Sequence, residues 1–147
     1  MSIEVEWVIV ADYAEIIGNK LYVQGGGWDR LTVNSAFPTS RLVGLAVSFS
    51  IPWDETNQRH PFKLEVMTED GSPAGRLEGQ LEVGRPAGVP AGQAQRSQIA
   101  ANITMKFDQE ATFVVIASAD GEELRRVPFN VVAGPNIRHN QQQPGAS

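Results

Sequence analysis

The sequence predicts an all-β protein, and three observations support this fold class. Apolar and polar residues alternate with a period of two through most of the chain, as in residues 76–83, which suits strands with one buried face. Gly18-Asn19, Asp70-Gly71 and Asp120-Gly121 separate alternating segments and favour tight hairpin turns. No long segment repeats its apolar residues at helical spacing. We therefore predict an antiparallel β-sandwich of about eight or nine strands, immunoglobulin-like or C2-like, with a closed barrel as the alternative.

The N-terminal part of the chain predicts three strands. The first places on one face the apolar residues Ile3, Val5, Trp7, Ile9 and Ala11. The turn at Gly18-Asn19 leads into a second strand at residues 21–23. The triplet Gly25–Gly27 interrupts the alternation before a strand at residues 28–33, which predicts a bulge or a crossover between sheets.

The clearest long strand covers residues 41–51, where large residues alternate with small ones until Pro52 ends the pairing. Two more strands are expected at residues 62–66 and 76–83. Residues 84–96 are rich in glycine and proline and have no apolar period, so they predict a long loop.

The last three strands are expected at residues 99–107, 113–118 and 127–131, and the turn at Asp120-Gly121 joins the final pair as a closing hairpin. We predict one domain over residues 1–133, because the chain has the length of a single domain. The polar residues 134–147 have little to bury and are expected to form a flexible tail.

Composition restricts the chemistry that the chain can perform. The 147 residues include no cysteine, which excludes disulfides, thiolate zinc sites and cysteine nucleophiles. The net charge of -5 and the scattered Lys and Arg residues argue against nucleic-acid binding. No phosphate-binding or other cofactor motif is present, so we expect no cofactor.

The sequence also allows an expectation about location. Residues 1–7 carry two carboxylates and no basic region, so a Sec-type signal peptide is not expected. No apolar run approaches the roughly 20 residues that span a bilayer. We therefore expect a cytoplasmic protein without membrane insertion, although non-Sec export or membership of a phage-like assembly fits the same sequence.

Two Trp-Asp pairs, Trp28-Asp29 and Trp53-Asp54, each lie where a predicted strand meets a loop. In one interpretation the two indoles lie beside a single ligand, such as a sugar ring or a partner's side chain, and stack on it. In the other, each indole closes an end of the sandwich while its aspartate accepts hydrogen bonds from local backbone N–H groups. All four residues are candidates for ligand or partner binding.

The densest run of polar side chains is at residues 53–60, and it adds to the candidates Glu55, Asn57 and His60. If the loops met at one end of the sandwich, several carboxylates could converge on calcium, namely Asp29, Asp54, Glu55, Asp70 and Asp120. Solvated loop carboxylates are the ordinary alternative. No contiguous calcium loop is present, so we predict no metal ligands.

His60 and His139 are the only histidines, which is too few for a structural zinc site in a chain without cysteine. His60 could act as a general base if Asp54 or Glu55 lay within hydrogen-bond reach, but the chain has no Gly-x-Ser-x-Gly elbow and no matched carboxylate pair that spacing identifies. We therefore predict no catalytic residues. Arg85, in the run Gly84-Arg85-Pro86, is a further binding candidate, because its guanidinium could pair with a carboxylate of a partner or with a local one.

Four short motifs occur in combination: ADYA at residues 11–14, GGGWD at 25–29, PW-x-E-x-N at 52–57 with His60, and GRP at 84–86. Together they resemble a family of uncharacterised bacterial, largely actinobacterial, domains that is known only as a domain of unknown function. The resemblance extends from about residue 8 to residue 132. It implies a small all-β domain, and it brings no established activity, so no functional residue can be assigned from it.

These observations favour a non-enzymatic β-sandwich that acts as a binding or assembly module. Edge strands with unpaired N–H and C=O groups, together with the turn-end loops, are its main surfaces for recognition. We expect self-association or a protein partner, with contacts through the N-terminal strand or the loop at residues 84–96. The alternatives are a calcium- or carbohydrate-binding domain that uses the turn-end loops, and a small hydrolase that uses His60. A small-molecule ligand is not identified by the sequence.

Overall fold

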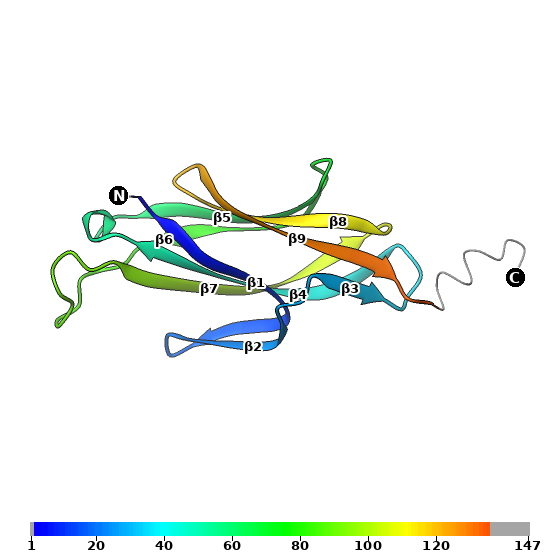
Figure 1. The fold of residues 1–147 in the computed structure, drawn as a ribbon, viewed down its shortest axis with the longest axis horizontal. Coiled ribbons are helices and arrows are strands. Elements are labelled where there is room, and N and C mark those ends of the chain that lie inside the picture. The colour runs from blue at the N-terminus through cyan, green and yellow to red at the C-terminus, as the bar shows by residue number, and fades with distance from the viewer. Residues whose placement is uncertain (1, 136–147) are drawn as a thin grey trace, which may run out of the picture.

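The computed structural model describes residues 2–135, which form nine strands and one short 3₁₀ helix (Figure 1). The strands are β1 (Glu4–Ile17), β2 (Lys20–Gly26), β3 (Arg30–Val33), β4 (Thr39–Ile51), β5 (His60–Thr68), β6 (Pro73–Leu81), β7 (Gln95–Phe107), β8 (Ala111–Ala119) and β9 (Glu122–Ala133), and the helix η1 is Trp53–Glu55. One sheet has the order β2-β1-β4-β7 and the other the order β3-β9-β8-β5-β6. The two sheets enclose a common core, which confirms the predicted all-β sandwich.

One strand pair departs from the antiparallel prediction. β3 runs parallel to β9, with Arg30 beside Asn130 and Val33 beside Ala133, whereas the other pairs in the described residues are antiparallel. The chain leaves one sheet at Gly26 and enters the other at Arg30, so of the two predicted alternatives, a bulge or a crossover between sheets, the glycine triplet marks the crossover. Because no hairpin joins β3 to β9, no tight turn forces this pair to be antiparallel.

The core lies between the sheets, and β4 is its central strand. Val43, Leu45, Val47, Phe49 and Ile51 have no exposed surface, which confirms the predicted large face of this strand. Three aromatic rings of β7, β8 and β9 pack against one another in this core, with ring centroids 5.1 Å apart between Phe107 and Phe113 and 5.5 Å apart between Phe113 and Phe129. Burial of this apolar surface is the main stabilising contribution to the fold.

β1 does not keep one apolar face, which corrects the prediction for the first strand. Val5 lies beside Phe49, but Trp7 lies beside Ser48, because Glu6 forms a β-bulge between them. A one-residue shift of this kind moves every later side chain to the opposite face. Val8 and Val10 therefore face the core in place of Trp7, Ile9 and Ala11.

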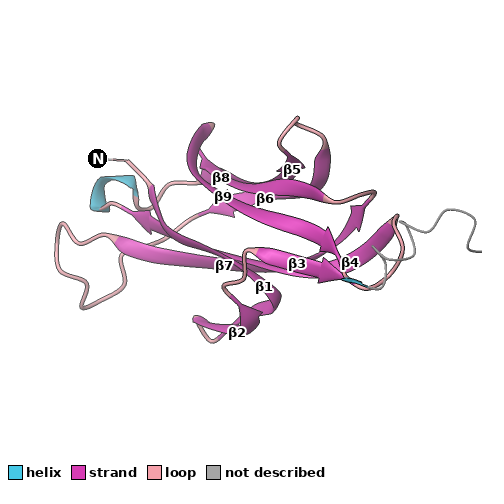
Figure 2. Cartoon of the chain, turned by 45° about the vertical axis from the view of Figure 1, so that its right-hand side comes forward, coloured by secondary structure: helices cyan, strands magenta, loops and turns pink. Residues whose placement is uncertain are grey.

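Beyond Ala11, β1 leaves its pairing with β4 and continues with β2 as a hairpin, which bends over the outer face of β4 (Figures 1 and 2). The hairpin backbone crosses β4 at Gly44, where an added Cβ would be 2.9 Å from the backbone N of Ala14. Asn102 of β7 holds it there, because its Oδ1 accepts from Ala14 N at 3.0 Å and its Nδ2 donates to Ala14 O at 2.8 Å. One side-chain amide thus replaces the strand pairing that the hairpin has left.

The turns agree with the sequence, and the tail is only partly described. Gly18 and Asn19 both have positive φ, as do Asp120 and Gly121, which is the geometry of type I′ hairpins. Residues 136–147 of the predicted tail lie outside the described residues. Within residues 2–135 no helix has the length and apolar composition needed to span a lipid bilayer.

Candidate functional site

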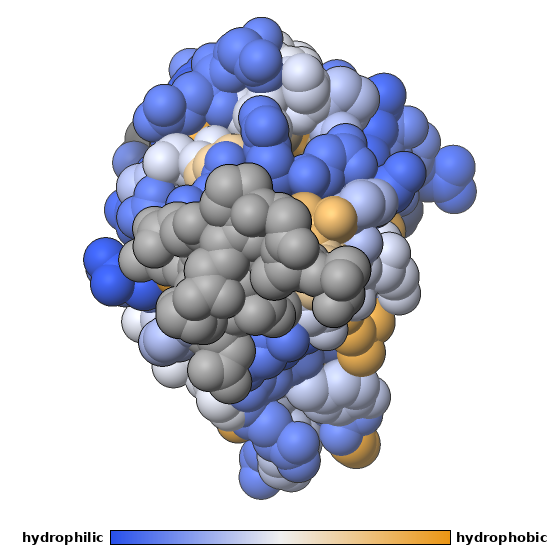
Figure 3. All heavy atoms as spheres, turned by 90° about the vertical axis from the view of Figure 1, so that its right-hand side faces the viewer, coloured by the Kyte–Doolittle hydropathy of each residue, from blue (hydrophilic) through white to orange (hydrophobic). Residues whose placement is uncertain are grey.

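The outward face of the β1–β2 hairpin carries exposed apolar side chains. In the strand register Tyr13 lies beside Gln24, Glu15 beside Tyr22, and Ile17 beside Lys20, so all six side chains share one face. We call these residues the hairpin surface. Ile17 is 55% exposed, Tyr22 49% and Tyr13 37%. Figure 3 shows small hydrophobic areas at the lower edge of a mostly hydrophilic end of the molecule, the side on which Figure 1 places the hairpin.

A second group of polar residues gathers where η1 leads into β5. Pro52 O accepts a hydrogen bond from Glu55 N at 2.9 Å and closes the single turn of η1. Thr56 Oγ1 donates to Trp53 O at 2.7 Å, which caps the C-terminal end of this turn. Asn57, with a φ of 60°, donates its backbone N–H to Val83 O at 2.7 Å. These bonds tie the loop before β5 to the chain that leaves β6.

Arg85 is bound locally by the same loop. Its Cζ lies 3.9 Å above the ring of Trp53, its Nε donates to Thr56 Oγ1 at 2.6 Å, and its Nη2 donates to Trp53 O at 2.7 Å. The PW-x-E-x-N and GRP motifs therefore meet in one contact, in which the guanidinium stacks on the indole. The acceptors of these two bonds are a hydroxyl and a carbonyl, whereas the sequence led us to expect a carboxylate.

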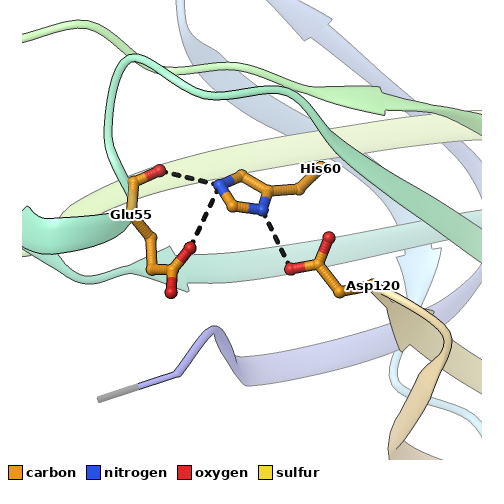
Figure 4. Close-up of side chains that lie close together, drawn as sticks. All are labelled: Glu55, His60 and Asp120. Carbon is orange, nitrogen blue, oxygen red and sulfur yellow. Dashed lines mark hydrogen bonds and ion pairs between the residues drawn. The ribbon is translucent and has the colours of Figure 1, made fainter.

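His60 is buried at the start of β5, with only 4% of its surface exposed, between two oxygen acceptors (Figure 4). Its Nδ1 lies 2.9 Å from Asp120 Oδ2, and its Nε2 lies 2.7 Å from the backbone carbonyl oxygen of Glu55. The Glu55 carboxylate is farther away, with Oε2 at 3.7 Å from Nε2. Asp120, on the turn between β8 and β9, is the carboxylate partner that sequence spacing did not identify.

Burial and hydrogen bonding have opposite effects on His60. Desolvation by burial, the largest single effect, lowers the pKa of the ring. The hydrogen bonds to Glu55 O and Asp120, with the negative charges of both carboxylates, raise it. The net result is a pKa of His60 above its ordinary value of 6.5.

Glu55, His60 and Asp120 offer ligand atoms that all lie within 4.8 Å of one another, and they are the group in the described residues that most resembles a metal site. The two carboxylates, however, face opposite nitrogens of the ring (Figure 4). A metal ion bonds to one imidazole nitrogen through its lone pair, so an ion on Nε2 would point away from Asp120. The arrangement suits hydrogen bonding better than metal binding.

The two Trp-Asp pairs do not come together. Trp28 packs edge-on against Phe129 of β9, with ring centroids 5.7 Å apart, and Asp29 O accepts from Asn130 N at 2.8 Å. Phe129 lies level with the Thr68 end of β5, whereas Trp53 lies near its His60 end. Nine residues of strand separate these ends, roughly 25 Å at about 3.3 Å per residue. Asp70 is also at the Thr68 end, where its Oδ1 accepts from Ser72 N at 3.2 Å.

One polar cluster was missed by the sequence analysis. Glu6, the residue of the β1 bulge, accepts from Arg96 Nε at 2.6 Å and Nη2 at 2.9 Å, and from Ser48 Oγ at 2.7 Å. Hydrogen bonds from Arg96 and Ser48 lower the pKa of Glu6 from 4.5 to about 2. The alternation of the first strand predicts only that Glu6 faces solvent. The bulge and the contacts with Ser48 and Arg96 depend on strand pairing, which the local sequence does not show.

The sequence from residue 6 to residue 132 matches a protein family described as "Family of unknown function (DUF6941)". The chain belongs to this family. The match covers nearly all of the described sandwich, including the η1 loop, His60, Arg85 and the hairpin surface, and it confirms the resemblance stated from the motifs. No curated protein matches the chain.

Two solved structures show a limited similarity to the chain. The similarity to Pseudomonas fluorescens alkylpurine DNA glycosylase AlkC bound to DNA containing an abasic site analog has a TM-score of 0.47 and 12% identity, over 90% of this chain and 31% of that one. A glycosyl hydrolase family 2 member from Bacteroides cellulosilyticus DSM 14838 gives a TM-score of 0.38 and 6% identity, over 67% of this chain and 13% of that one. The chain thus spans less than a third of either protein, and we draw no functional argument from them.

Proposed function

We propose that the protein is a non-enzymatic assembly module that pairs with a second copy of itself through the β1–β2 hairpin. The observation that carries this proposal is the hairpin surface, on which Tyr13, Ile17 and Tyr22 lie exposed on one face beside an open sheet edge. The fourth large exposed apolar side chain in the described residues, Leu42, is on β4 of the same sheet. Exposed apolar side chains beside an open edge are typical of association surfaces.

β2 is the edge least protected against pairing. Within the described residues the edge strands are β2, β7, β3 and β6. β6 begins with Pro73 and carries the exposed Arg76 and Glu78, and β3 has only four residues. β7 carries the exposed charges of Arg96 and Lys106. β2 has no proline and a single charge, Lys20, at its beginning, so it lacks the features that usually block edge pairing.

A second copy fits this edge because the backbone pattern is self-complementary. Two β2 strands related by a two-fold axis run antiparallel, so the unpaired N–H groups of each strand face the carbonyl groups of the other. The same two-fold rotation places the hairpin surfaces of the two copies side by side on one face of the joined sheet, with Tyr22 of one copy near Tyr22 of the other. The apolar side chains that each copy exposes to water are then partly covered by the other copy.

Light scattering over a concentration series tests the proposal. The mass of the unaltered protein should rise from 16.0 kDa toward twice that value as concentration increases. Tyr22→Lys should raise the dissociation constant of the dimer at least tenfold, because it places a charge where the hairpin surfaces of the two copies meet. Gln80→Lys is the matched control, since it makes the same charge change at an exposed position of the β6 edge, and it should leave the dissociation constant unchanged.

A strict monomer at the highest attainable concentration, or equal effects of the two variants, would contradict the proposal. The calcium-binding alternative requires a different result: an ion bound to the native state must raise the melting temperature. The described structure favours it less, because Asp29 and Asp70 lie far along the sandwich from Asp54 and Glu55. The hydrolase alternative requires a free lone pair on His60, whose two nitrogens both face oxygen acceptors. A cytoplasmic location stays part of the proposal.

A further inference from the structure

His60 joins three segments at one end of the sandwich. The residue begins β5, its Nε2 contacts the carbonyl oxygen of Glu55 in η1, and its Nδ1 contacts the carboxylate of Asp120 in the β8–β9 turn. The turn is attached to the same strand by a second bond, in which Asp120 N donates to Pro61 O at 2.9 Å. The contact with η1, from Nε2 to the Glu55 carbonyl oxygen, depends on the protonation state of the imidazole ring.

Both oxygens that face the ring can only accept hydrogen bonds. A carbonyl oxygen has no proton, and an ionised carboxylate has none either. A neutral imidazole carries one N–H, so one of its nitrogens would direct a lone pair at an oxygen less than 3 Å away. Only the doubly protonated imidazolium donates to both acceptors at 2.9 and 2.7 Å.

We infer that His60 is an imidazolium latch that holds the η1 turn and the β8–β9 turn to β5, and that loss of its proton releases the η1 turn. A neutral ring keeps one N–H, and the carboxylate of Asp120 is the stronger acceptor because it is charged. The proton therefore stays on Nδ1, and the bond from Nε2 to Glu55 O is lost. The η1 turn that loses this bond to β5 carries Trp53, and the bonds from Arg85 to Trp53 O and from Asn57 N to Val83 O still hold it to the chain after β6.

The charges around the ring favour the cation. η1 contributes the Glu55 carboxylate, 3.7 Å from Nε2, and the β8–β9 turn contributes Asp120. β6 places the uncharged Leu81 opposite His60. The adjacent Arg59 is paired with Glu82 at 3.1 Å, and both of these side chains are mostly exposed, which weakens their effect on a buried ring.

The sign of the pH dependence follows from the raised pKa of His60. The folded state holds the proton more tightly than the unfolded chain, so the stabilisation is complete below 6.5 and declines as pH rises through the folded-state pKa. Between 6.5 and the folded-state pKa the equilibrium constant for unfolding increases with pH, by at most tenfold per pH unit for a single proton.

Nuclear magnetic resonance of the ring nitrogens tests the latch directly. His139→Gln leaves His60 as the only histidine and keeps the latch residues unaltered. In this protein both nitrogens of His60 should be protonated below 6.5, and the ring should titrate above that value. Asp120→Asn, which suits the positive φ at this position, should lower the pKa of His60 by more than Glu55→Gln, because Glu55→Gln retains the carbonyl acceptor.

A ring with a single N–H below 6.5, or a titration unchanged in Asp120→Asn, would overturn the inference. His60→Gln provides an independent readout. The urea midpoint of the unaltered protein should decline as pH rises above 6.5, and that of His60→Gln should not show this decline. If His60→Gln does not fold, the titration of the native ring still decides the question.

Discussion

The attachment of the β1–β2 hairpin to the sheet rests on Asn102, and Asn102→Ala should loosen it. The side-chain amide satisfies both the N–H and the C=O of Ala14, a residue that is 1% exposed. An unsatisfied buried polar group costs about 1–3 kcal/mol. With two groups affected and partial access of water at the hairpin, we expect a loss of about 2–4 kcal/mol in the free energy of unfolding. A loss of this size is a large share of the roughly 5–15 kcal/mol that stabilises a typical domain.

Urea unfolding measures this loss, and hydrogen exchange locates it. Amides of residues 12–26 should lose protection in Asn102→Ala, while those of β5 and β8 keep it. Gln98→Ala is the control, because Gln98 makes one exposed hydrogen bond, from Nε2 to Asn19 O at 3.2 Å, on the same hairpin. That variant should lose at most about 1 kcal/mol. If Asn102→Ala stays within about 0.5 kcal/mol of the unaltered protein and its hairpin protection is unchanged, the proposed attachment is refuted.

Two further predictions concern the same sheet. Gly44→Ala should lower the free energy of unfolding, measured in urea, by about 1–3 kcal/mol, because its Cβ would meet the backbone of Tyr13 and Ala14 at 2.9 Å. Gly84→Ala is the control and should be nearly neutral, because its Cβ meets only Asn57 Oδ1 at 3.7 Å. Equal losses in the two variants would contradict the crossing at Gly44. Glu6 has a pKa lowered to about 2, so its stabilisation is complete above 4.5 and is lost as pH falls toward 2. Since Glu6 is 31% exposed and Arg96 60% exposed, solvent screening limits this contribution to about 1 kcal/mol. The free energy of unfolding of Glu6→Gln should therefore equal that of the unaltered protein near pH 2 and be lower above 4.5. A difference in this free energy that does not change with pH would argue against the ion pair.

The sandwich could be predicted from the sequence because its strands and turns are specified by residues that are close together in the chain. Alternation of large and small residues in β4 identifies the face that packs into the core. Gly18-Asn19 and Asp120-Gly121 identify hairpins whose two central residues have positive φ, whereas at Asp70-Gly71 only the glycine has positive φ. Glu6 shows where local reasoning ends. A bulge changes neither composition nor alternation, and it reverses the face of every later residue of β1.

The partners within the candidate sites could not be predicted, because they join residues far apart in the chain. His60 and Asp120 are 60 positions apart, and Asn102 and Ala14 are 88 positions apart. His60 and Arg85 are binding candidates from two separate segments of the sequence, and their partners in the fold depend on sheet order. The hairpin surface could not be predicted either, since nothing local to Tyr13 or Tyr22 shows that β1 leaves β4 beyond Ala11 and bends with β2 over the outer face of the sheet.

Hydrogen exchange of the unaltered protein at low and high concentration tests the central claim most directly, because it reports which edge becomes paired. We predict that amides of β2, at Lys20–Gly26, gain protection as concentration rises, while those of the β6 edge, at Pro73–Leu81, do not change. Protection that is independent of concentration, or that rises at β6 or β7 and not at β2, would contradict the account.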